Sequence, residues 1–344
     1  MNAEVAPHVH ESLEKYSDLL FTTAITVYVL VMILFLVALA GQSSRKRQSK
    51  ELVGAAAGSS STAGSFAGDR TPGRVSGPEP RRDSGEKLAR MAYPVIFVGI
   101  LAHLGSIVVR GVATERVPWG NMYEFISLTC LACVVAATIA LRKPAQRPLL
   151  GFVMIPVVLM MFAGGKFLYT QAAPVVPALK SYWLAIHVSV ISVASGILLT
   201  SGVASILYLF RQQWKRTEEQ IAADETASGL SAALRRIADR IPSSDSLDRV
   251  AYKCVVVGFP LLGLGIIFGA IWAERSWGRF WGWDPKETVS FISWIIYAAY
   301  LHARATAGWK TAAAWINVAG FAAIVFNLFF INLVVSGLHS YAGL

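Results

Sequence analysis

Eight apolar runs divide the sequence, and most are long enough to cross a lipid bilayer as a helix. They cover approximately residues 19–40, 91–109, 122–141, 149–164, 182–210, 251–271, 288–304 and 312–336. Backbone polar groups inside a bilayer must be satisfied within their own segment, so runs of this kind fold as helices. The sequence therefore predicts an all-α polytopic membrane protein with about eight transmembrane helices.

The composition excludes other classes of protein. Of the 344 residues, 55% are hydrophobic and only 15% are charged, whereas soluble proteins average about 25% charged residues. That deficit excludes an ordinary soluble protein and a disordered one. The net charge of +10 does not indicate a nucleic-acid partner, because the basic residues lie in blocks between the apolar runs.

The distribution of positive charge predicts the orientation. The segments expected inside the cell contain 23 of the 31 Lys and Arg residues, which favours eight spans with both termini outside. Residues 1–40 form an N-terminal tail and the first span. Residues 41–90, rich in Gly, Ser, Ala and Pro, are expected to be a flexible cytoplasmic linker.

Residues 91–344 are expected to form the functional membrane domain. A polar cytoplasmic loop is predicted at 211–250, with a short amphipathic helix at about 230–241. A tryptophan-rich loop is predicted on the outer face at 272–287. Cys130 and Cys133 have the C-x-x-C spacing of redox-active pairs. The favoured interpretation is that they are two small apolar side chains on a spanning helix.

The tryptophan-rich loop carries the strongest signal. It contains Trp272, Trp277, Trp281 and Trp283 within twelve residues. Tryptophan favours the membrane interface, but an interfacial belt explains only one or two per loop. The interleaved glycines let a flat ligand approach, and neighbouring indoles give a broad apolar face that suits a porphyrin.

The end of this loop predicts a helix start. Asp284 has the residue type of an N-cap, Pro285 suits the first helical position, and Glu287 completes a capping box. The neighbouring cations Arg275, Arg279 and Lys286 are either solvated or paired with carboxylates of a ligand.

The histidines indicate what the aromatic face holds. His187 lies near the outer end of the fifth span and His339 follows the last span, so both are expected beside the tryptophans. Two neutral imidazoles would give an iron porphyrin two axial ligands. His302 and His103 lie at membrane depth and are either functional or hydrogen-bonded to a neighbouring helix. His8 and His10, in the tail, are given no role.

These motifs resemble a known family. The stretch 272–287 resembles the tryptophan-rich WWD signature of haem-handling proteins, and residues 284–288 match its DPKET ending. Residues 118–124 are similar to an outer P-x-S-N-x-Y-E motif, with Gly120 in place of Ser, and 337–341 match a terminal G-L-H-S-Y. The resemblance is to the CcsA/ResC type of cytochrome c biogenesis protein of system II, called CcsB in some actinobacteria.

This resemblance implies a function in cytochrome c biogenesis. Haem b would be carried across the bacterial plasma membrane and presented at the extracytoplasmic face, where a haem lyase complex attaches it to an apocytochrome. His187 and His339 would be the outer iron ligands, and His302 would be an inner ligand. The face that holds the ring would comprise Trp277, Trp281, Trp283 and Asp284.

The same resemblance implies partners. They are a CcsB/ResB-like membrane subunit, an apocytochrome c with the motif C-x-x-C-H, and thiol reductant proteins. Two other functions stay open on the residues alone. One is a respiratory b-type haem subunit. The other is a small-molecule transporter without haem, in which Gly265 and Gly269 would serve helix packing.

Overall fold

The computed structural model describes residues 11–41, 84–172, 179–214 and 229–339. Within these ranges every regular element is a helix, as the sequence predicted. The long helices are α1 (Glu11–Gly41), α3 (Ser84–Ala113), α4 (Met122–Ala140), α5 (Leu150–Phe167), α6 (Tyr182–Gln213), α9 (Ser244–Trp277), α10 (Pro285–Ala305) and α11 (Lys310–Phe326). Three short helices are η2 (Arg147–Leu149), α8 (Leu230–Arg240) and the π-helix η4 (Asn327–Ile331).

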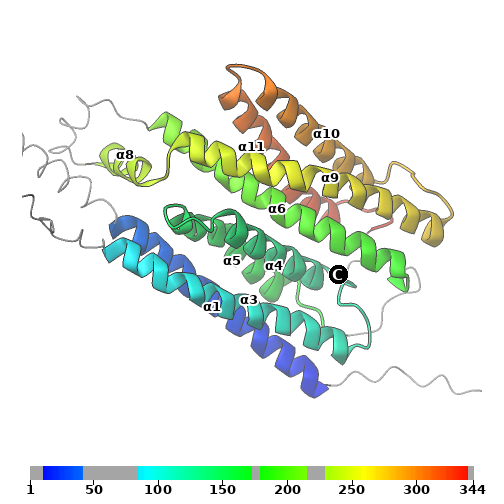
Figure 1. Cartoon of the computed structure of the whole chain (residues 1–344). Helices are drawn as coiled ribbons and strands as arrows, with labels where there is room; N and C mark the ends of the chain where they lie inside the picture. Colours follow the sequence, from blue (N-terminus) through cyan, green and yellow to red (C-terminus); the bar gives the residue numbers. More distant parts are fainter. Residues whose placement is uncertain (1–10, 42–83, 173–178, 215–228, 340–344) are drawn as a thin grey trace, which may run out of the picture.

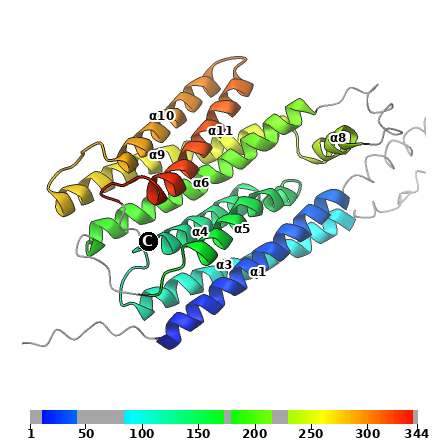
Figure 2. The same ribbon diagram turned by 180° about the vertical axis from the view of Figure 1, so that it is seen from behind.

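The helices form a bundle with a clear order across it (Figure 1). The antiparallel pair α1 and α3 lies along one edge, α4 and α5 lie in the middle, and α6 packs with α9. Helices α10 and α11 cover the opposite edge, which Figure 2 shows from behind. The first residues of α1 and the last described residues lie towards the same end of the bundle (Figure 1).

Seven of the described helices are long and apolar enough to cross a membrane. Helix α10, which corresponds to the expected span 288–304, is not among them. Its first turn contains Lys286 and Glu287, and its last turn contains His302 and Arg304. Polar residues therefore occupy both of its ends. It still runs antiparallel to its neighbours, and the chain therefore reverses direction at each long helix (Figure 1).

Helix α6 is the centre of the bundle because its apolar and small residues face neighbours on several sides. A Cβ atom at Gly196 would lie 2.5 Å from the backbone nitrogen of Cys133, so α4 approaches α6 as closely as a glycine allows. All three cysteines are buried free thiols, in agreement with the helix-packing interpretation of Cys130 and Cys133. This close crossing holds the second half of α4 against the middle of α6.

A buried ion-pair cluster fixes the first turn of α4. The Glu124 carboxylate accepts from Arg110 Nε of α3 at 2.8 Å and from Arg116 Nη1 at 2.9 Å. Asn121 caps α4 by accepting from the Glu124 amide at 2.9 Å. Trp119 Nε1 donates to the Ala185 carbonyl oxygen of α6 at 3.0 Å. The motif at 118–124 therefore joins α3, α4 and α6.

Several boundaries differ from the predicted ones. Residues 84–90, predicted as the end of the linker, form the first turns of α3, while 42–83 lie outside the described residues. The expected loop 211–250 contains α8 and the start of α9. Helix α8 confirms the amphipathic segment, but it buries Ala232 and Ala238, and Leu230 is 76% exposed.

Candidate functional site

A cavity lies between α4, α6, α9, α10, α11 and the residues that follow α11. The residues that line it are Phe125, Thr129, His187, Ile191, Ser195, Leu262, Ile266, Gly269, Ala270, Trp272, Ala273, Trp277, Phe280, Trp281, Lys286, Glu287, Ser290, Ser293, Ile324, Asn327, Leu328 and His339. The cavity therefore brings together His187 and His339, which the sequence predicted to share a site.

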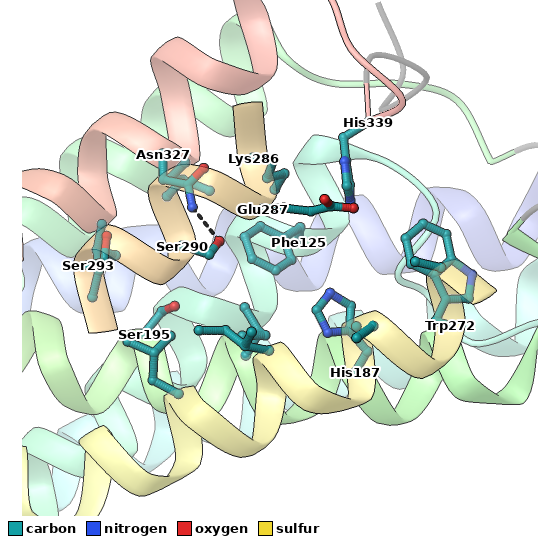
Figure 3. A pocket seen from close by; sticks show the side chains of 18 of the residues that line it. Phe125, His187, Ser195, Trp272, Lys286, Glu287, Ser290, Ser293, Asn327 and His339 are labelled. Carbon is teal, nitrogen blue, oxygen red and sulfur yellow. Dashed lines mark hydrogen bonds between the residues drawn. The ribbon is translucent and has the colours of Figure 1, made fainter. Parts of the chain in front are cut away.

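The cavity has two chemically different ends (Figure 3). His187, His339, Trp272 and Trp277 form what we term the histidine end. The other end, termed the hydroxyl end, is lined by the polar uncharged side chains Ser195, Ser290, Ser293 and Asn327. Thr129 belongs to it as well, because it lines the cavity one turn before Cys133, whose backbone packs on Gly196 beside Ser195. Phe125 and Lys286 lie between the two ends in the view of Figure 3.

His187 is held by the crossing of α6 and α9. Its Nδ1 lies 2.8 Å from the carbonyl oxygen of Gly265, so Nδ1–H donates this hydrogen bond. The imidazole can lie this close to α9 only because residue 269, one turn after Gly265, is a glycine. A Cβ atom at Gly269 would lie 2.7 Å from Cε1 of the imidazole. With Nδ1 protonated, Nε2 carries the lone pair of the neutral ring and is the nitrogen available to a metal.

His339 is held by a carboxylate. Its Nδ1 lies 2.7 Å from Oδ2 of Asp284, and Oδ1 of Asp284 accepts from the Leu338 amide at 2.8 Å. Gly337 lets this segment approach, because a Cβ atom there would lie 2.7 Å from Asp284 Oδ1. Asp284 also caps α10, in the capping box with Glu287 that the sequence predicted. With Nδ1–H donating to Asp284, the lone pair of the neutral His339 ring is on Nε2.

The charges of this pair follow from its surroundings. Burial lowers the pKa of His339, although the hydrogen bond to Asp284 opposes the shift. Burial alone would raise the pKa of Asp284, but the hydrogen bonds from His339 and from the Leu338 amide lower it below its usual value. The imidazole is therefore neutral at pH 7 and the carboxylate is ionised, which is the arrangement that prepares a histidine to bind a metal.

Trp272 lies beside both histidines and was not among the expected site residues (Figure 3). It is 2% exposed and stacks on His187, with ring centroids 6.1 Å apart and planes 8° from parallel. The centroid of His339 lies 5.8 Å from that of Trp272 and 5.2 Å from that of Trp277. Trp272 belongs to the last turns of α9 and not to a loop.

The other tryptophans divide into two groups. Trp277 and Trp281 line the cavity, whereas Trp283 is 67% exposed and does not. The indoles do not form the single flat face that the sequence suggested, because Trp272 and Trp277 are inclined by 64° and Trp281 and Trp283 by 88°. Trp283 has φ of 58°, a strained conformation for a bulky residue, at the turn before Asp284.

The two histidines at membrane depth do not join this cavity. His302 lies sixteen residues along α10 from Lys286, about 24 Å away, and its side chain is exposed. His103 is buried, with Nδ1 3.3 Å from Tyr28 Oη and Nε2 2.9 Å from Ser127 Oγ. Both ring nitrogens of His103 are therefore occupied, which makes it a hydrogen-bonded core residue.

The hydroxyl end was missed at the sequence level. Ser290 and Ser293 follow Lys286 at helical spacing on α10, and this spacing was the available signal. Nothing in the sequence alone places Thr129 of α4 or Ser195 of α6 beside them, because these contacts join segments far apart in the chain. Phe125 was missed for the same reason.

The geometry fits an iron porphyrin. Within the described ranges, no three His, Cys, Asp or Glu side chains gather to hold a metal ion by themselves. Two imidazoles suit an ion that brings in-plane ligands of its own, as haem iron does. The fold and the site together define a polytopic membrane protein whose cavity brings two histidines and two tryptophans together.

The family is established by comparison with known proteins. The cytochrome c assembly protein family matches residues 119–339, a range that includes all the residues lining the cavity. The chain belongs to this family, and it is a membrane protein of cytochrome c biogenesis, as its resemblance implied.

The similar curated proteins are named cytochrome c biogenesis protein CcsA. That of Gloeobacter violaceus is 33% identical over 288 residues, covering 72% of this chain and 85% of the relative. That of Mesostigma viride is 33% identical over 258 residues, covering 72% of this chain and 84% of the relative.

Among solved structures, the cytochrome c haem lyase CcmF shares the fold. It aligns with a TM-score of 0.59 and 16% sequence identity, covering 92% of this chain. The chain spans about half of that lyase, since the alignment covers 46% of it.

Proposed function

We propose that this protein carries haem b across the membrane and presents it at the outer face for attachment to apocytochrome c. The observation that carries the proposal is the pair His187 and His339. Both line one cavity beside Trp272, and each has its Nδ1 held by an acceptor. Each Nε2 then carries the lone pair that would bind the iron, one on either side of the ring.

The chain contributes positioning rather than acid–base chemistry. Trp277 and Trp281 hold the porphyrin within the cavity, and Asp284 holds His339. Trp283, which is exposed and contacts Trp281, covers an edge of the ring that projects from the cavity. The thiols of the apocytochrome then add to the two vinyl groups. In each addition a C–S bond forms at one vinyl carbon and the thiol proton moves to the other, so no electrons are gained or lost. The histidine of the apocytochrome motif C-x-x-C-H replaces one axial ligand.

His302 serves as an inner ligand in this proposal. Its imidazole is exposed on α10 at the end opposite to the cavity, where haem would enter from the cytoplasmic side. A second axial ligand there would come from a CcsB/ResB-like subunit. The membrane would be the bacterial plasma membrane, with the cavity facing outward and thiol reductant proteins keeping the apocytochrome thiols reduced.

The experiment is a spectroscopic one on the protein purified with its partner subunit. Absorption spectra and pyridine haemochrome assays would compare His187→Ala and His339→Ala with the unchanged chain. Each variant is expected to lose the spectrum of iron with two imidazole ligands and to stop maturing cytochrome c. The tail variant His8→Ala is the matched control. Retained haem together with normal cytochrome c maturation in both cavity variants would refute the proposal.

A respiratory b-type haem subunit is less well supported. It requires histidines facing each other on spanning helices at two depths, but both nitrogens of His103 are occupied by Tyr28 and Ser127. A purified protein whose haem is reduced and reoxidised by a quinone would favour this alternative.

A further inference from the structure

The cavity holds a cation that has no acidic partner. Lys286 lines it, and within the described residues no carboxylate oxygen lies within 4.0 Å of its Nζ. The ammonium group donates to Oδ1 of Asn332 and lies 5.7 Å from the ring centroid of Phe125. An ammonium group in such an apolar setting binds an anion strongly, because few waters compete for it.

The hydroxyl end begins beside Lys286 and extends away from the histidines. Ser290 and Ser293 lie about 6 and 10 Å further along α10, and Ser195 lies about 12 Å beyond His187 along α6. Asn327 donates to Ser290 Oγ at 2.8 Å. These side chains come from three different helices, yet they line one end of one cavity (Figure 3).

Two atoms of the hydroxyl end are unsatisfied. Thr129 is 1% exposed and its Oγ1 has no hydrogen-bond partner, and Oδ1 of Asn327 is also buried without one. A buried polar atom without a partner is costly, and a ligand or water that supplies the missing hydrogen bond removes the cost. The hydroxyl end is therefore built to receive polar groups, in contrast to the aromatic histidine end.

We propose that Lys286 and the hydroxyl end bind the propionate groups of haem and thereby set which edge of the ring faces outward. This proposal rests on the function proposed above. The two propionates and the two vinyls of haem b lie on opposite edges of the macrocycle. With the propionates beside Lys286 and the serines, the vinyl edge faces the end of the cavity where residues 278–284 connect α9 to α10.

Glu287 restricts where the propionates can lie. It lines the cavity, and its Oε2 accepts from the amides of Gly282 at 2.9 Å and Asp284 at 3.2 Å. Its negative charge repels a propionate from that side of the helix. The ammonium group of Lys286 is positive and the hydroxyls further along α10 are uncharged. A propionate carboxylate can therefore lie beside them without repulsion.

The test compares ferric haem with its dimethyl ester, which lacks the two negative charges and keeps the ring, iron and vinyls. The purified chain would be titrated with each, and the ratio of the two dissociation constants measured from the Soret band. The unchanged protein is expected to bind haem about tenfold or more tightly than the ester, as for a hydrogen bond between charged groups. Lys286→Met should bring this ratio close to one, and Lys286→Arg should retain it.

Arg275→Gln is the matched control, because it removes a cation of the same segment whose side chain is 68% exposed. It should leave the ratio unchanged. An unchanged ratio in Lys286→Met, or an unchanged protein that binds both porphyrins equally, overturns the proposal while leaving the two-histidine site intact. A protein that binds neither porphyrin overturns the proposed function itself, and this proposal with it.

Discussion

The carboxylate of Asp284 joins two segments that are 55 residues apart in the chain. It caps α10, accepts from the Leu338 amide and orients the imidazole of His339. The capping box could be predicted from local spacing, since its partners lie within three residues. The contact with His339 could not, because no local pattern specifies a pairing over that distance.

At Asp284, the substitution Asp284→Asn tests the orientation of His339. Asparagine is also a good N-cap, so α10 should still form. The loss of the negative charge beside His339 should weaken haem binding by about 10- to 100-fold, as for other carboxylates behind metal-binding histidines. Titration with ferric haem measures this. Asp245→Asn, at an exposed pair with Lys310, is the control, and equal affinity in both variants would contradict the role of Asp284.

The lowered pKa of His339 predicts a pH dependence. A proton and iron compete for Nε2, and burial holds the pKa of His339 below its usual value of 6.5. The two-imidazole spectrum should therefore persist as the pH falls to 6.5 and disappear only at lower pH. The unfolded chain binds this proton more readily than the folded one, so stability also decreases as the pH falls below 6.5. Absorption spectra measured against pH would test this, and loss of the spectrum above pH 6.5 would contradict it.

At the scale of elements, the crossing of α6 and α9 determines where His187 stands. The sequence predicted both helices, and only the alternative of a small-molecule transporter gave Gly265 and Gly269 a role, in helix packing. The structure adds that Gly265 supplies the acceptor for His187 and that Gly269 leaves room for the ring. The end of α9 was misplaced, although Gly278, in the left-handed region with φ of 73°, is a typical signal of a helix end.

Gly269→Ala should displace the His187 imidazole. The added methyl would lie 2.7 Å from Cε1 and 2.9 Å from Nδ1, so the ring must turn away and its bond to Gly265 is lost. We expect haem to bind with one imidazole ligand, which electron paramagnetic resonance distinguishes from two. Gly105→Ala is the control, because its nearest contact would be 3.4 Å from a Leu20 side chain. A two-imidazole signal in Gly269→Ala would show that His187 does not bind iron in this orientation.

At the scale of the whole molecule, hydropathy and charge predicted the alternating helices and the end at which His187, His339 and the tryptophans meet. Hydropathy is informative here because every long apolar run must satisfy its backbone groups as a helix. The hydroxyl end, the stacking of Trp272 on His187 and the exposure of Trp283 depend on tertiary packing. Side-chain contacts between distant helices set these features, and neither hydropathy nor spacing encodes them.

Cysteine labelling tests the orientation of the whole chain. The three native cysteines are buried and should not react with a maleimide that cannot cross the membrane. Labelling of a single added cysteine then reports the side of the membrane on which that residue lies. Arg275→Cys and Leu338→Cys should react from outside the cell. Lys310→Cys, at the start of α11, should react only after the membrane is opened. Labelling of positions 275 and 338 from opposite sides would exclude a shared site for His339 and the tryptophans.

The unequal partners of the two imidazoles have an electronic consequence. His187 donates to a neutral amide carbonyl, whereas His339 donates to a carboxylate, which pushes more electron density onto its Nε2. Iron held between them would have one strong and one ordinary donor, and the ferric state would gain the greater stabilisation. Potentiometry should show a higher reduction potential in Asp284→Asn, so the same carboxylate that starts a helix would also decide how readily the iron accepts an electron.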